Sequence, residues 1–305
     1  MDAIQKGLLE KVADLHEIPE GAYNIRANGG LGGRNTTANI DIVSKEDKPG
    51  IDIIIKPNTK NESVHIPVII SESGLNEMVY NDFYIGENAD VIIVAGCGIH
   101  NSGDEASSHD GIHTFHVGKN AKIKYVERHY GEGEGTGAKI MNPETVIFID
   151  DGGYMEMETT QIKGIESTVR KTTATIGNDA KLVIRESLMT HGKQFAKTDF
   201  TVDLNGENSS ANVISRSVAK DESYQEFYSN IRGNNKCAGH TECDAILMDK
   251  ARVVAIPEIS ANHIDASLIH EAAIGKIAGE QLIKLMTLGL SEEEAEEQIV
   301  NGFLK

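Results

Sequence analysis

The stretch Ile85-Gly86-Glu87-Asn88-Ala89-Asp90-Val91 decides the fold, because it returns in recognisable form farther along the chain. The copies are Val117-Gly118-Lys119-Asn120-Ala121-Lys122-Ile123 and Ile176-Gly177-Asn178-Asp179-Ala180-Lys181-Leu182, with a shortened form at Met248-Asp249-Lys250-Ala251-Arg252-Val253. Each full copy places a glycine and an Asn or Asp, residues that tolerate a left-handed backbone, before a small alanine and a strand-forming run. Ile85 precedes Val117 by 32 residues, and Val117 precedes Ile176 by 59. These offsets predict one and two coils of a β-solenoid, whose turns stack in register.

Short β-branched runs fill the chain between about residue 22 and residue 262. Examples are Ile51–Ile55, Val68–Ile70, Val91–Val94, Lys122–Val126, Thr145–Ile149 and Lys181–Ile184. Each run is bounded by Gly, Asn or Asp, as strands between tight turns are. No helical segment between them is long enough for regular βαβ crossovers, so a doubly wound sheet is disfavoured. The class is therefore mainly β, and an antiparallel sandwich, in which Gly-x-Asn turns also recur, is the alternative to a solenoid.

Helical periodicity appears only at the two ends of the chain. The first amphipathic helix is predicted over Ala3 to Leu15, with an apolar face of Ile4, Leu8, Leu9, Val12 and Leu15. Past Pro257 the helical period returns at Leu268, Ala272, Ile277, Leu282, Ile283 and Leu285, and a capping box of Ser291 and Glu294 predicts a last helix. We therefore divide the chain into an N-terminal helical segment (1–20), a β-helix core (21–262) and a C-terminal helical segment (263–305).

Composition and charge exclude several classes of function. The 305 residues are 39% hydrophobic, enough for a substantial core, and carry a net charge of -18 with no basic run, which excludes a nucleic-acid partner. The first residues lack the basic flank and apolar run of a signal peptide, and no apolar stretch approaches the roughly 18 residues that span a membrane. We expect a cytoplasmic protein without a membrane partner, whose three cysteines are free thiols.

Two of the three cysteines flank a histidine in Cys237-x2-His240-x2-Cys243. Thiolates and imidazoles bind iron, zinc and copper. In one extended strand, residues three apart face opposite sides, and residues six apart are separated by roughly 20 Å. Gly233 and Gly239 argue against a helix, so either a turn gathers the ligands or only one or two of them serve a given site. Ordinary packing of partly buried cysteines is the alternative.

A second pair of candidate ligands, His270-Glu271, follows Cys243 by about one solenoid coil. Stacking of adjacent coils would bring the two halves together. The alternative is a solvent-facing pair at the start of a helix, where a carboxylate favours the positive end of the dipole.

A further histidine group comprises His100, His109, His113 and His116, with Cys97 just before it. His113 and His116 could converge with Glu127 as in a β-barrel metalloenzyme, although the spacing fits no established signature. Polar residues at solenoid corners are the simpler interpretation. Cys97 directly follows a buried-looking strand, which favours a structural role.

Two glycine-rich stretches, at residues 28–34 and 131–137, lack the spacing of nucleotide-binding loops. The second also carries carboxylates that would repel phosphate. Any ATP hydrolysis must therefore come from another chain.

A series of short motifs in the last third of the chain resembles a known family. They are Arg232-Gly233, Glu242-Cys243-Asp244, Leu268-Ile269-His270-Glu271-Ala272, Gly279-Glu280-Gln281-Leu282, Gly289-Leu290-Ser291-Glu292 and Ile299-Val300-Asn301-Gly302-Phe303. In this order they resemble the carboxy-terminal part of the SufB/SufD scaffolds of iron-sulfur cluster assembly. The resemblance implies a right-handed parallel β-helix and a scaffold, not an enzyme, that holds a transient iron-sulfur cluster between two protomers.

The resemblance also implies roles for individual residues. Cys243 and Glu271 match the SufB residues that build the cluster, with His270 beside them, and Cys237 with His240 corresponds to a cysteine–histidine pair of SufD. A chain with both sets is expected to form a homodimer. The implied partners are a SufC-like ABC-type ATPase bound by the C-terminal helices, a sulfur donor protein and apo iron-sulfur proteins.

The sequence departs from the family in two places. The chain is expected to lack most of the amino-terminal region of SufB. The segment where SufB carries a sulfur-accepting cysteine after Tyr-x-Glu-Gly reads Tyr125-Val126-Glu127-Arg128-His129 here. Two other classes stay open, a sugar-active β-helix enzyme and a cupin-like metalloenzyme that uses His109, His113 and His116.

Overall fold

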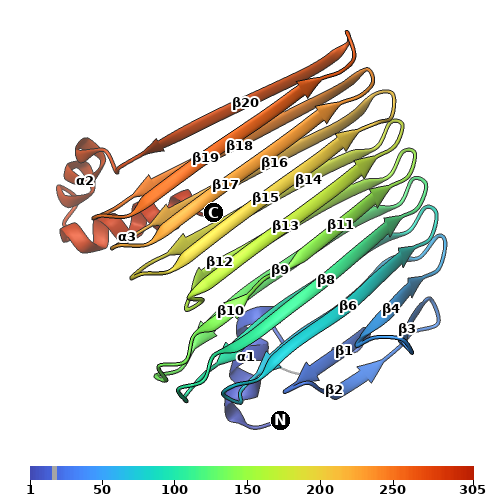
Figure 1. The fold of residues 1–305 in the computed structure, drawn as a ribbon, viewed down its shortest axis with the longest axis horizontal. Coiled ribbons are helices and arrows are strands. Elements are labelled where there is room, and N and C mark those ends of the chain that lie inside the picture. The colour runs from blue at the N-terminus through green and yellow to red at the C-terminus, as the bar shows by residue number, and fades with distance from the viewer. Residues whose placement is uncertain (16–18) are drawn as a thin grey trace.

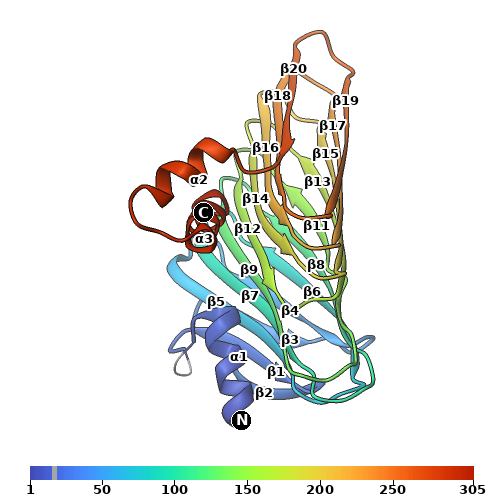
Figure 2. The same cartoon turned by 90° about the vertical axis from the view of Figure 1, so that its left-hand side faces the viewer.

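The computed structural model describes residues 1–15 and 19–305 and shows a β-solenoid of about eight turns. Figures 1 and 2 show its strands stacked into two facing sheets. Among the described residues, one helix lies near the N-terminus and two lie near the C-terminus. Strands of successive coils pair in parallel, as β13 (Ser167–Ile176) and β15 (Phe195–Leu204) do. The predicted β-helix is therefore confirmed, and the antiparallel sandwich is excluded.

Within the described residues, the two sheets each contain ten strands. Sheet A has the order β2 (Gly30–Asn35), β1 (Ala22–Ala27), β5 (Lys60–Ile70), β7 (Asp90–His100), β9 (Lys122–Glu132), β12 (Tyr154–Lys163), β14 (Lys181–Thr190), β16 (Ser209–Ala219), β18 (Cys237–Leu247) and β20 (Ala266–Gly275). Sheet B has the order β19 (Arg252–Ala261), β17 (Tyr224–Gly233), β15, β13, β10 (Lys139–Met141), β8 (Ser107–Val117), β6 (Asn76–Ile85), β4 (Gly50–Ile55) and β3 (Ile40–Ser44), and β11 (Glu144–Ile149) joins β13 and β8. Strands β20 and β19 end the two sheets at the C-terminal end of the solenoid.

The repeated turns stack along one corner of the solenoid. The aliphatic residues before them are Cα partners from strand to strand, in the series Ile85, Val117, Ile149 and Ile176. Asn88, Asn120 and Asp179 have φ angles of 57°, 54° and 53°, the left-handed backbone predicted for them. The backbone N–H of Asn88 donates to the carbonyl of Lys119 at 2.9 Å, which ties one turn to the next coil. The alanine after each of these turn residues is buried.

The interior is a continuous apolar column over most of its length. Side chains alternate between inward and outward positions along each strand, and the inward ones form one cluster that runs from Ala22 to Cys243. Phe83 and Phe115 stack inside it with ring centroids 4.3 Å apart. Burying a side chain of this size stabilises a fold by about 1.5–3 kcal/mol, so the column holds successive coils together.

Helix α1 (Ala3–Ala13) covers the outer face of sheet A. Leu8 and Val12 are fully buried, and the helix begins at a capping box of Asp2 and Gln5. A Cβ at Gly96 of β7 would lie 2.6 Å from the carbonyl oxygen of Val12, so the close approach of helix and strand requires glycine there. The predicted N-terminal helix is confirmed over Ala3–Ala13.

The helical period predicted past Pro257 is wrong for the residues of β20. This segment pairs along its whole length with β18, because the edge of sheet A offers it unpaired backbone groups. Ala266 and Leu268 pack against the core at a period of two. After β20, the helices of the described chain are α2 (Gly279–Met286) and α3 (Glu292–Phe303), and the predicted capping box of Ser291 and Glu294 is present.

Helix α3 lies against the ends of strands in sheet A, and Figure 2 shows both C-terminal helices on that side of the molecule. Val300 and Leu304 pack with Val218, and Ser187 donates a hydrogen bond to the carbonyl of Leu304 at 2.9 Å. Helices in the described part of the chain are too short or too polar to cross a bilayer.

Candidate functional site

Strand β18 carries both C-terminal cysteines. Its extended backbone places Cys237 and Cys243 on the inward face, 6% and 1% exposed, and both thiols are free. His240 is three residues from each cysteine, and its side chain therefore points to the outward face. The Cys-x2-His-x2-Cys motif therefore does not surround one metal ion.

Strand β20 brings the second half of the motif beside the first. Thr241 and His270 are Cα partners, and so are Glu242 and Glu271. The alternating burial of β20 places His270 on the inward side and Glu271 on the outward side. Strand pairing between successive coils therefore brings the two halves of the motif side by side. Their side chains, however, are divided between the inner and outer faces of the sheet.

The inner face holds Cys243 and His270. Burial first, and then the charges of Glu186 and Asp244, raise the pKa of the Cys243 thiol to about 12, so the thiol is protonated at neutral pH. Burial and then His240 lower the pKa of His270, which favours the neutral imidazole that binds metals. Both ring nitrogens of His270 are buried and have no hydrogen-bond partner among the described residues.

The outer face holds His240, Glu242 and Glu271. Their ligand atoms all lie within 4.8 Å of one another. Nε2 of His240 is 3.5 Å from Oε2 of Glu271, and its Nδ1 is 2.9 Å from Oδ1 of Asn212 on β16. Burial and then a hydrogen bond with the Asp244 side chain raise the pKa of Glu242. Sequence reasoning named His240 and Glu271 but missed Glu242, whose position two residues after His240 was the available signal.

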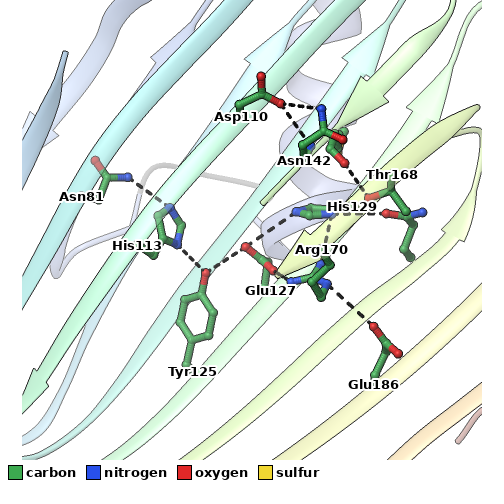
Figure 3. A network of polar contacts seen from close by, with 12 residues as sticks. Asn81, Asp110, His113, Tyr125, Glu127, His129, Asn142, Thr168, Arg170 and Glu186 are labelled. Carbon is green, nitrogen blue, oxygen red and sulfur yellow. Dashed lines mark hydrogen bonds and ion pairs between the residues drawn. The ribbon is translucent and has the colours of Figure 1, made fainter. Parts of the chain in front are cut away.

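A buried polar network lies beside the apolar column, and sequence reasoning missed it as a unit (Figure 3). Nδ1 of His113 is 2.8 Å from the hydroxyl of Tyr125, which donates to Oε1 of Glu127 at 3.0 Å. Arg170 reaches Glu127 at 2.6 Å and Glu186 at 3.8 Å. Burial alone would raise the pKa of Glu127, but Arg170 and the neighbouring histidines hold it well below its usual value.

The polar network continues toward Cys243. Glu127, Thr159, Glu186, Ser215 and Cys243 follow one another as Cα partners across sheet A. Oγ of Ser215 donates to Oε2 of Glu186 at 2.7 Å. A row of inward-facing polar side chains therefore runs from the middle of the solenoid to the Cys243 thiol near its C-terminal end.

The predicted histidine group does not form one site. His113 and His109 face inward, whereas His116 faces outward and stacks between Tyr84 and Phe148 at 5.0 and 5.4 Å. The convergence of His113 and His116 on Glu127 is therefore wrong, because they lie on opposite faces of β8. His100 contacts Ser102 at 2.7 Å instead.

Cys97 borders a small cavity in the interior. The cavity has a volume of about 20 Å³, and its polar lining consists of Cys97, His109, His113, Glu127 and His129. Cys97 and His129 are Cα partners on β7 and β9. Complete burial, and then nearby carboxylates, raise the pKa of the Cys97 thiol well above its usual value, so Cys97 is a protonated, packed side chain.

Comparison with known proteins places the chain in a family. A family model described as the SufBD core domain of SUF system FeS cluster assembly matches residues 70–303. An iron-sulfur cluster assembly SufBD family protein of Archaeoglobus fulgidus is 30% identical over 264 residues, which cover 85% of this chain and 69% of the relative. One of Methanothermobacter thermautotrophicus is 30% identical over 244 residues, covering 78% of this chain and 57% of the relative.

A protein of Bacillus subtilis named iron-sulfur cluster assembly protein SufB is 36% identical over 102 residues, which are 32% of this chain and 22% of that protein. The family model covers most of the solenoid together with the C-terminal helices. On the strength of these matches, the chain belongs to the SufBD family of the SUF system for iron-sulfur cluster assembly.

Proposed function

We propose that this chain is a scaffold on which a nascent iron-sulfur cluster is built at the C-terminal end of the solenoid. The observation that supports the proposal is the position of Cys243. This residue is a free thiol on the strand next to the edge of sheet A, and His270 lies on the same face of the edge strand. Thiolates hold such clusters, and imidazole can replace them. The proposed cluster and metal residues are Cys243, His270, Glu271, Cys237 and His240.

Assembly requires a change in the protonation of Cys243. A thiol with a pKa of about 12 neither attacks sulfur nor binds iron until it loses its proton. Iron binding displaces that proton, and opening of the edge strand would remove the burial that raises the pKa. The scaffold itself is not an enzyme. A donor protein supplies sulfur, and the finished cluster, which is cargo, passes to apo iron-sulfur proteins.

The proposed assembly interface is the open end of the solenoid. Strands β19 and β20 have a neighbour on only one side within the described chain, so their outer backbone groups can pair with another strand. Apolar side chains stand exposed around this edge, namely Ile256, Ile259, Ile264 and Ile269. A second copy of the chain would cover them, and a two-fold interface would place two copies of Cys243 and His270 around one site.

The proposed site for a SufC-like ABC-type ATPase is the pair of C-terminal helices. Three apolar side chains are exposed on α2 or directly after it: Ile283 (62%), Met286 (42%) and Leu288 (76%). An exposed apolar surface of this kind is typical of a site that binds a partner protein. The two glycine-rich stretches lack a nucleotide-binding pattern, so the energy for any opening step comes from a partner chain.

The proposal is tested by analysing the protein for iron, acid-labile sulfide and zinc after anaerobic co-purification with a SufC-like ATPase. Iron and sulfide in equal amounts, with an absorbance band of the cluster, are expected. Zinc without sulfide would contradict the proposal, since zinc would indicate a structural metal site.

A further inference from the structure

Three candidate metal ligands lie on the outer face of sheet A, whereas the cysteine thiols lie on its inner face. His240 and Glu242 come from β18, and Glu271 comes from β20, where it is the Cα partner of Glu242. All three ligand atoms lie within 4.8 Å of one another. We propose that His240, Glu242 and Glu271 form a mononuclear site for a divalent first-row metal ion, separate from Cys243 and Cys237 on the inner face.

The imidazole of His240 is oriented for this task. Oδ1 of Asn212 can only accept a hydrogen bond, so the ring nitrogen 2.9 Å away, Nδ1, carries the proton. In the neutral ring, Nε2 is then the nitrogen with a free lone pair, and it lies 3.5 Å from Oε2 of Glu271. Metal-binding histidines commonly donate their other N–H to an oxygen that fixes the ring, and Asn212 is such a positioning residue.

The two carboxylates are placed to bind a cation between them. Directly opposed like charges on neighbouring strands destabilise a sheet. The Asp244 side chain adds to the negative charge beside Glu242. Arg216 is 3.9 Å from Glu242, but its side chain is 41% exposed, so the two make only a weak, solvent-screened pair. A divalent ion bound to both carboxylates would relieve this repulsion, and three ligands would leave positions open for water or an incoming group.

The donor types select the metal. One imidazole and two carboxylates suit Fe²⁺, Mn²⁺, Co²⁺ or Zn²⁺, whereas Cu⁺ prefers thiolates and Mg²⁺ or Ca²⁺ prefers oxygen alone. If the proposed function holds, the physiological ion is Fe²⁺, and this part of the inference rests on that function. The sheet would then keep iron on its outer face apart from the sulfur-accepting thiol on its inner face until the edge opens.

The test is an anaerobic titration of the full-length protein with Fe²⁺, and with Co²⁺ as a spectroscopic probe, without sulfide. Wild-type protein is expected to bind about one ion per chain, and the Co²⁺ complex should lack the near-ultraviolet band of thiolate-to-cobalt charge transfer. Glu242→Gln keeps the size of the side chain and removes its charge, so affinity should fall at least tenfold. Asn212→Ala should weaken binding roughly 10–100-fold, as loss of an orienting residue does at other metal sites.

Two controls separate this inference from the proposed function. Glu158→Gln removes an outward carboxylate on a distant strand, β12, and should leave the titration unchanged. Cys243→Ser should retain Co²⁺ binding even where it abolishes cluster formation. A thiolate band in the wild-type complex, or loss of binding in Cys243→Ser but not in Glu242→Gln, would overturn the outer site. Unchanged thermal unfolding of Glu242→Gln without metal shows that any lost affinity is not lost folding.

Discussion

Cys243 and Glu271 lie on neighbouring strands but point to opposite faces of the same sheet. The Cα partner of Cys243 is Ala272, and that of Glu271 is Glu242, so the thiol and the carboxylate are one register position apart. Successive residues of a strand alternate between faces, and this single step therefore separates them. The proposed cluster, if it uses both groups, has to form where the sheet ends or opens, which is at the edge strand.

The first prediction concerns the thiol. Cys243→Ser should abolish the absorbance of a cluster reconstituted with Fe²⁺ and sulfide, because it removes the soft ligand and keeps the side-chain size. Glu271→Ala should reduce assembly less, since water can partly replace a carboxylate. Cys97→Ser, a matched buried change, should assemble normally. Normal clusters in Cys243→Ser together with their loss in Cys97→Ser would move the site to the interior cavity.

The second prediction concerns the ATPase. Truncation after Gly275 removes α2 and α3 but leaves every strand of the solenoid, and it should abolish co-purification with a SufC-like ATPase. Ile283→Glu, at a side chain that is 62% exposed, should weaken binding without unfolding the chain. Ile54→Glu on β4 is the control at a comparable exposed position. Retained one-to-one binding by the truncated chain would contradict the prediction.

The third prediction concerns self-association. If the proposed partnership holds, light scattering of the protein with a SufC-like ATPase should give two copies of each chain. Ile259→Lys places a charge on β19 and should shift the scaffold to a monomer, because charged side chains on edge strands block pairing. Val169→Lys on the central strand β13 should remain dimeric. A wild-type scaffold that stays monomeric at all concentrations would remove the interface site.

The fourth prediction concerns acid stability. Burial lowers the pKa of His113 from 6.5 to about 4, so between these values the unfolded chain binds a proton that the folded chain does not. The free energy of unfolding should therefore fall by about 3 kcal/mol from this group as pH decreases from 6.5 to 4. His113→Gln removes the titration and should flatten this part of the profile in urea unfolding experiments. An identical pH dependence of the two proteins would show that His113 is not buried as a neutral group.

The fifth prediction concerns the buried ion pairs. Arg170→Met should destabilise the protein by about 3–5 kcal/mol, because Glu127 and Glu186 would keep buried charge without a partner. Arg185→Met removes an exposed pair with Glu156 and should cost less than about 1 kcal/mol. Adding Glu127→Gln to Arg170→Met should restore part of the loss. Equal effects of the two arginine substitutions in chemical denaturation would contradict the burial of Arg170.

The solenoid could be predicted from sequence because its corner repeats, and the left-handed turn residues Asn88, Asn120 and Asp179 mark it. The division of Cys237, His240 and Cys243 between faces followed from strand geometry. The strand at residues 266–275 could not be predicted, because its apolar residues also fit a helical period and only pairing with β18 decides between the two. The network around Arg170 was hidden, since its members meet through strand register across coils.

The coils of this solenoid differ in perimeter although one corner stays constant. His129 and Gln161, in contact across one coil, are 32 residues apart, whereas Asp151 and Asn178 are 27 apart. Ile149 and Ile176 remain Cα partners through this change, so the extra length is taken up away from the corner. Figure 2 shows the solenoid broader toward its N-terminal coils. Coil length thus sets the width of the solenoid, and the longer coils are the ones that hold Glu127, His129 and the small cavity beside Cys97.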